Sequence, residues 1–191
     1  MNSEIDREDV LLLIFESYER LFQKASFNGV TRLEKLVFLL GAEGNLKDID
    51  TLFAFRAYKF GPYSKSVYEA ADFLQSVDLV RVETKPYYSY FLAEEEKELQ
   101  RDIETEGDGE EQIPSGHERL FTLTDNGKAV ADKLRLAWET EHPEYLRKID
   151  EIVSRYGSLP LNQIIRYVYR RFPKMAEKSI HPEAQNLAHE A

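Results

Sequence analysis

Histidine is the residue type in this chain most suited to catalysis or metal binding, and its copies are scattered. They are His117, His142, His181 and His189. None has a metal-ligand spacing such as His-x3-His, and no glycine-rich phosphate loop occurs in the sequence. Ser115-Gly-His117 puts a hydroxyl near an imidazole, but the sequence identifies no acid that could orient the ring. We therefore expect no enzyme activity, no catalytic residues, no metal site and no cofactor.

The negative charge of the chain is concentrated in one stretch, residues 94–111 (EEEKELQRDIETEGDGEE). This stretch holds ten acids and two bases, so it carries −8 of the net charge of −10 and leaves −2 for the remaining residues. Acids in such a polar segment are more often solvated than paired for acid–base work. We expect a mobile loop or a frayed helix here, which forms an acidic insert at 94–116.

Two other segments are basic. Residues 56–68 carry three bases and no acid, and residues 146–178 carry eight bases against three acids. Aromatic residues interleave with the bases of the first segment, which could provide a stacking surface for nucleic acid. Alternating aromatic residues on an extended segment usually pack a core, however, and we favour that interpretation, with Lys59 and Lys65 solvated. In the second segment, Arg166 and Arg170 share one helix face and could contact phosphate, an acidic partner or the insert, or simply be solvated.

Hydrophobic periodicity predicts the elements that position these residues. Helices are expected at 9–24, from Thr31 to Gly41 or Gly44, at 64–77, from Thr124 or Asp125 onward, from Pro143 to Gly157, and at 161–172. Thr31 and Glu34 fit a capping box at the start of the second helix. Residues 52–60 look extended and end in a Gly61-Pro62 turn. Strands are expected at 79–83, 87–92 and 119–124, with a turn at 84–86.

This order of elements indicates a fold class. Three helices followed by a β-hairpin are typical of the winged-helix plan. We predict an α+β fold, mostly α, with a winged-helix-like core (three helices plus a β-hairpin wing) and additional C-terminal helices. A single domain should cover residues 1–179, including the acidic insert, and residues 180–191 should form a polar, poorly ordered tail.

The outward face of the predicted third helix bears on the kind of partner. At ~100° per residue, the side opposite Leu74 carries Lys65, Glu69, Asp72 and Ser76, with Tyr68 beside them. A DNA-reading helix normally offers cationic or amide side chains, whereas phosphate would repel two carboxylates. The face could be solvated, read DNA or bind a protein. The candidate partner-binding residues are Lys59, Tyr63, Lys65, Tyr68, Glu69 and Asp72.

Three stretches resemble a known family when taken in order. They are LEKLVFLL (33–40), YKFGPYSKSVYE (58–69) and YVYRRFPKMAEKS (167–179). They are similar to the YwgA-like family and, more distantly, to the SocA-like antitoxin (Panacea) domains. FTLTDNGK (121–128) also resembles the strand-to-helix junction common in winged-helix regulators. The resemblance covers 9–179 without the acidic insert, and it implies a prokaryotic domain that neutralises toxins or hands them to a protease by binding proteins.

These features together predict a non-enzymatic, cytoplasmic protein-binding regulator or antitoxin-like adaptor, whose partner is a toxin, a protease or another regulator. No apolar run approaches the ~18 residues that span a bilayer, so we expect no membrane partner. The N-terminus is too acidic for a signal peptide, and the absence of cysteine fits the cytosol. The alternative is a DNA-binding transcriptional regulator that uses the wing residues Arg81 and Lys85 with Arg166 and Arg170. Winged-helix proteins often pair through terminal helices, so we also consider a homodimer.

Overall fold

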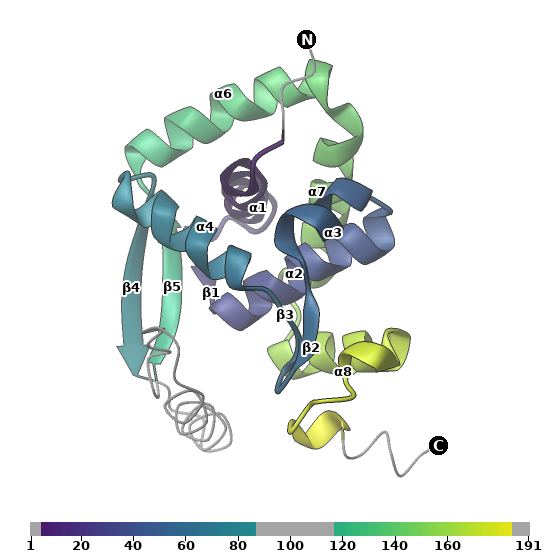
Figure 1. Ribbon diagram of the computed structural model, residues 1–191. Helices are drawn as coiled ribbons and strands as arrows, with labels where there is room; N and C mark the ends of the chain where they lie inside the picture. Colours follow the sequence, from purple (N-terminus) through teal and green to yellow (C-terminus); the bar gives the residue numbers. More distant parts are fainter. Residues whose placement is uncertain (1–4, 87–116, 185–191) are drawn as a thin grey trace.

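The protein is described by a computed structural model that covers residues 5–86 and 117–184 of the 191-residue chain. Helices predominate over strands, so the fold is α+β and mostly α, as predicted (Figure 1). In this part, the elements are α1 (Arg7–Phe22), β1 (Ser26–Asn28), α2 (Val30–Gly44), α3 (Lys47–Phe53), β2 (Arg56–Tyr58), β3 (Gly61–Tyr63), α4 (Lys65–Ser76), β4 (Val80–Pro86), β5 (His117–Leu123), α6 (Asp125–Glu141), α7 (Pro143–Tyr156), α8 (Leu161–Arg171) and the short η1 (Pro173–Met175). None of these helices is both long enough and apolar enough to cross a membrane.

Helix α1 forms the centre of the protein because its middle is apolar on every side. The consecutive residues from Val10 to Phe15 are each at most 3% exposed, as expected for a helix enclosed by other elements. Helices α4, α6 and α7 pack around it, and Figure 1 shows it almost end-on between them. Phe15 also packs on Phe27 of β1 and Phe121 of β5, with ring centroids 5.5 and 5.3 Å away. The core therefore joins the helices to the sheet.

The larger sheet is antiparallel, with the strand order β1-β5-β4. The predicted strands at 79–83 and 119–124 are confirmed as β4 and β5. The turn predicted at 84–86 is wrong, because β4 runs on to Pro86, opposite His117 of β5. The predicted strand at 87–92 and the acidic insert at 94–116 lie outside the described residues.

The segment between α2 and α4 differs from the sequence prediction. Its first part is the helix α3, because Leu46, Ile49 and Phe53 recur at helical spacing and are all buried. The extended part is a two-stranded hairpin of β2 and β3. The turn of this hairpin precedes Gly61 instead of using Gly61-Pro62, since Tyr58 already pairs with Gly61.

One of the two side-chain caps predicted for helix starts is confirmed. Thr124 caps α6, because its Oγ1 accepts the Gly127 N–H at 2.9 Å. The capping box of Thr31 and Glu34 is wrong, because α2 begins at Val30 and the Glu34 side chain turns into the core, where only 3% of the residue is exposed.

The chain after α8 folds back onto the hairpin, and we call residues 173–184 the C-terminal strap. The Ile180 N–H donates to the Lys59 carbonyl at 2.9 Å, and His181 is only 8% exposed. Figure 1 shows this segment, in yellow, beside β2. Residues 180–184 are therefore packed and do not form the poorly ordered tail that their polar sequence predicts. Residues 185–191 lie outside the described part.

Candidate functional site

The three stretches that carry the family resemblance meet at one place, which we call the hairpin junction. It consists of Glu34 and Lys35 on α2, the hairpin β2–β3, and Tyr169 of α8 with the C-terminal strap. Tyr169 and the strap lie more than a hundred residues after α2 and the hairpin in the sequence, so only the tertiary fold brings them together.

A buried ion pair on α2 is the first part of the hairpin junction. Lys35 Nζ lies 3.7 Å from Glu34 Oε2 and donates to the Pro62 carbonyl at 2.9 Å. Glu34 Oε1 accepts the Ser64 N–H at 3.2 Å. Desolvation raises the pKa of Glu34 to about 7, even though Lys35 opposes the shift, and it lowers the pKa of Lys35. The pair therefore fixes β3 and the start of α4 against α2.

Hydrogen bonds between the strap, α8 and the hairpin are the second part of the hairpin junction. The Tyr169 hydroxyl lies 2.7 Å from Ser179 Oγ, which in turn donates to the Lys59 carbonyl at 3.0 Å. The His181 ring packs edge-on against Phe60 and Tyr169. Burial lowers the pKa of His181, which favours the neutral ring. These contacts hold the tip of the hairpin in place.

Gly61 is required where the hairpin meets α8. Its φ is +89°, a conformation that side chains disfavour, and a Cβ at this position would lie 2.6 Å from Tyr169 Cε1. The sequence prediction assigned Gly61 to a turn, but its role in the structure is to let the tyrosine ring approach the strand.

A ladder of tyrosines runs from the hairpin onto α4. The ring centroids of Tyr58 and Tyr63 are 5.1 Å apart, and those of Tyr63 and Tyr68 are 5.8 Å apart. The Arg56 guanidinium lies 5.5 and 5.3 Å from the first two rings. All three tyrosines are half-buried. The core packing favoured from the sequence is therefore wrong for them, and they line the surface.

The outward face of α4 carries the residues that the sequence predicts there. Lys65, Glu69 and Asp72 are all exposed. Glu69 lies 3.3 Å from Arg7 and 3.8 Å from Lys65, and Asp72 lies 2.5 Å from Arg119 of β5. Both carboxylates are thus neutralised by the protein's own cations.

Two apolar side chains accompany these ion pairs. Phe73 is 51% exposed and Val77, just beyond the end of α4, is 41% exposed. Helical periodicity alone would place Val77 on the buried side of α4 and Phe73 on the flank of that side. Val77 escapes burial because α4 ends at Ser76, so the helical period no longer applies. The result is an apolar patch at the C-terminal end of α4.

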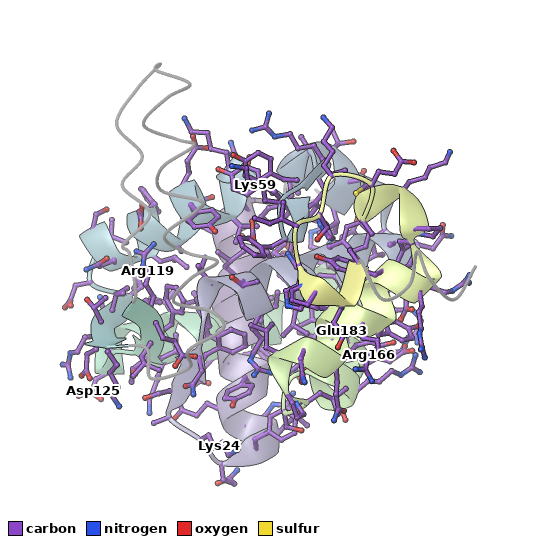
Figure 2. All side chains as sticks on the ribbon, turned by 90° about the horizontal axis from the view of Figure 1, so that it is seen from below. Lys24, Lys59, Arg119, Asp125, Arg166 and Glu183 are labelled. Atoms are coloured by element: carbon purple, nitrogen blue, oxygen red, sulfur yellow. The ribbon has the colours of Figure 1, made fainter. Side chains whose placement is uncertain are left out.

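The residues proposed for DNA binding lie in two separate places. Arg81 and Lys85 are exposed on β4, whereas Arg166 and Arg170 are exposed on α8, which lies on another side of the protein (Figure 1). Arg166 forms a two-pronged contact with Glu183 of the strap, at 2.8 and 2.6 Å, and Figure 2 shows the two side by side. The structure therefore does not bring the four cations into one patch.

A second polar cluster, which the sequence did not predict, ties α1 to α6 and α7. Arg135 donates to Glu16 at 2.7 Å, to Asp150 at 2.9 and 3.1 Å and to Ser17 at 2.8 Å. Burial alone would raise the pKa of Asp150, but the hydrogen bonds from Arg135 and Ser17 hold it below its usual value. The cluster lies beside a pocket of about 430 Å³, in which Lys128 is paired with Glu19 at 2.5 Å. The contacts of the cluster are those of a half-buried structural network.

The histidines stay apart in the fold. His142 packs against Trp138, His181 is a buried residue of the strap, and His117 begins β5, while His189 is outside the described residues. Within residues 5–86 and 117–184, no group of three His, Cys, Asp or Glu side chains is placed to hold a metal ion. The chain matches no protein-family model, and no curated protein matches its sequence.

Proposed function

We propose that the protein is a non-enzymatic, protein-binding regulator or antitoxin-like adaptor, of the kind that the YwgA-like and SocA-like resemblance implies. The observation that carries the proposal is the outward face of α4, where the exposed Phe73 and Val77 lie beside carboxylates already held in ion pairs. Exposed apolar side chains with a polar rim suit a protein interface.

The order of elements supports a winged-helix-like core. Helix α1, strand β1 and helices α2 and α4 precede the paired strands β4 and β5, and β1 adds to the free edge of β5. Helix α3 and the hairpin β2–β3 are then an insertion ahead of the third core helix. This insertion places the hairpin next to α4 and extends the proposed surface.

The proposed interface consists of the tyrosine ladder and the outward side of α4. Tyr63 and Tyr68 offer large rings with hydroxyls at their edges, which are frequent anchors of protein interfaces. Phe73 supplies the apolar contact, and Lys65 and Glu69 belong to the polar rim. Lys59 contributes its carbonyl to the strap and thereby fixes the hairpin.

DNA binding is the second candidate function, and the exposed cations on β4 favour it. Arg81 and Lys85 could contact phosphate from the wing. Arg166 is less suitable because Glu183 already occupies its guanidinium. The carboxylates on α4 also oppose a nearby phosphate backbone.

A DNA titration distinguishes the two functions. Polarisation of labelled random-sequence duplex DNA should show no binding even at ~20 mM salt, where non-specific affinity is strongest. A variant that lacks residues 94–111 is measured in parallel, because the acids of the insert could mask a basic surface. Micromolar affinity of the full chain with a steep negative salt slope would contradict the proposed function.

A further inference from the structure

The two basic segments of the sequence form one surface in the structure. Strap residues Pro173–Met175 (η1) pack against β2, and the strap amide of Ile180 is bonded to the hairpin carbonyl of Lys59. Figure 2 shows Lys59 beside the yellow strap. Residues 56–68 and the end of 146–178 are thus neighbours although about a hundred residues separate them in the chain.

Four cations of this surface come from different elements. We define the hairpin–strap surface by Arg56 of β2, Arg171 at the end of α8, and Lys174 and Lys178 of the strap, all of which are exposed. Arg171 lies over the Phe172 ring, which packs on Phe38 and through it on Phe55 next to Arg56. Among the described residues, no carboxylate forms an ion pair with any of these four cations. The surface therefore retains its positive charge.

The tyrosine ladder adjoins these cations at Arg56. Tyr58, Tyr63 and Tyr68 lie one against the next with interplanar angles of 44° and 38°, and Arg56 covers two of them. Rings packed on one another have much of their faces occupied, so a nucleic acid base has little room to stack between them. Phenol hydroxyls and guanidinium N–H groups are instead good donors to carboxylates.

We propose that the hairpin–strap surface binds an acidic segment of a partner protein. The carboxylates of the segment lie on Arg56, Arg171, Lys174 and Lys178, beside the tyrosine ladder. This inference rests on the proposed function, because it states that the partner protein proposed above has an acidic segment. An apolar part of the same partner would contact Phe73 and Val77 at the C-terminal end of α4.

The test is a polarisation titration of the full chain with labelled oligo-glutamate. An oligo-lysine peptide and a single-stranded oligonucleotide of equal charge serve as comparison probes. The inference predicts binding of oligo-glutamate that is at least ~10-fold tighter than binding of the oligonucleotide, and no binding of oligo-lysine. Tighter binding of the oligonucleotide would overturn the inference in favour of a nucleic acid partner.

A matched pair of charge-reversal variants shows where the probe binds. Lys174→Glu with Lys178→Glu should weaken oligo-glutamate binding at least ~10-fold, whereas Lys24→Glu with Lys133→Glu, which changes the net charge equally, should weaken it less than ~3-fold. Lys24 lies at the opposite end of the protein from Lys59 (Figure 2). Equal weakening by both pairs would overturn the inference, because it would mean attraction by overall charge alone.

A third variant tests whether the chain's own acids occupy the surface. All acids of residues 94–111 are replaced by their amides in the full-length chain. Binding that appears only in this variant would overturn the proposal of an external acidic partner. If oligo-glutamate does not bind any form while the duplex DNA titration is also negative, this inference fails and the proposed function stands.

Discussion

The Ile180 N–H donates to the Lys59 carbonyl and fastens the C-terminal strap to the turn of the hairpin. This bond links the second of the three family-like stretches to the end of the third, because Lys59 belongs to YKFGPYSKSVYE and Ile180 directly follows YVYRRFPKMAEKS. Ser179 and Tyr169 reinforce it with side-chain hydrogen bonds. The hairpin, which forms part of the proposed interface, is therefore held from the C-terminal side.

Removal of the Ser179 hydroxyl should loosen the strap. Ser179→Ala deletes a group that bonds to Tyr169, to the Lys59 carbonyl and to the His181 amide, so we expect a loss of about 1–3 kcal/mol in the free energy of unfolding. Urea denaturation measures it. Ser158→Ala, at an exposed position, should change the same quantity by less than ~0.5 kcal/mol. Equal effects of the two substitutions would mean that the strap contributes nothing to stability.

Removing one charge of the buried ion pair should lower the free energy of unfolding more than removing both charges does. Lys35→Met leaves Glu34 without the cation that opposes the rise of its pKa, so we expect destabilisation by about 3–5 kcal/mol at a pH well above 7, where the buried carboxylate is charged, and a smaller loss below pH 7. Adding Glu34→Gln should recover part of this loss, because an amide is neutral and can still accept the Ser64 N–H. Chemical denaturation of both single variants and the double variant gives the coupling energy. Simple additivity of the two single effects would contradict the pairing.

The pH dependence of stability should change when Glu34 is replaced. Its pKa of about 7 in the folded protein lies above the ordinary value of 4.5, so the folded state binds the proton more tightly than the unfolded state. The associated stability is fully present below about pH 4.5 and is lost as the pH rises through about 7. The free energy of unfolding of wild type, compared with Glu34→Gln, should therefore fall over this range. A difference between them that stays constant across the range would refute the raised pKa.

Gly61 should not tolerate a side chain. Gly61→Ala combines a positive φ with a Cβ 2.6 Å from the Tyr169 ring, and we expect a loss of at least about 1–3 kcal/mol in the free energy of unfolding. Thermal or urea unfolding provides the measurement. Gly109→Ala lies in the acidic insert and serves as a second glycine substitution for comparison. A neutral result for Gly61→Ala would mean that the hairpin can move away from α8.

Long amphipathic helices were predictable from sequence because their burial depends on local periodicity alone. Helices α4, α7 and α8 follow their apolar stripes, and Pro143 marks the start of α7 as expected. The short helix α3 was missed because its two turns are too few to establish a helical period, and the segment predicted as extended, 52–60, overlaps only its end. The hairpin turn was misplaced because Gly61 suggests a turn, whereas close packing against Tyr169 is what requires it.

The contacts of the candidate site could not be predicted because they depend on residues far apart in the chain. Asp72 meets Arg119 only through the register of β4 and β5, and Arg166 meets Glu183 only because the strap folds back. One local signal did exist for the buried pair. Glu34 and Lys35 lie between Leu33 and the apolar residues 36–40, and a helix buried on every side along this stretch has to bury charged side chains as well.

The most direct test of the proposed interface is photo-crosslinking from the outward face of α4. A photoreactive phenylalanine analogue replaces Phe73 in one variant and Leu136, which is 68% exposed on α6, in a control variant. Both are expressed in the cells that produce the protein. The proposal predicts a discrete protein adduct from position 73 that survives nuclease treatment and is absent from position 136. Adducts that disappear with nuclease, or that form equally at both positions, would contradict it.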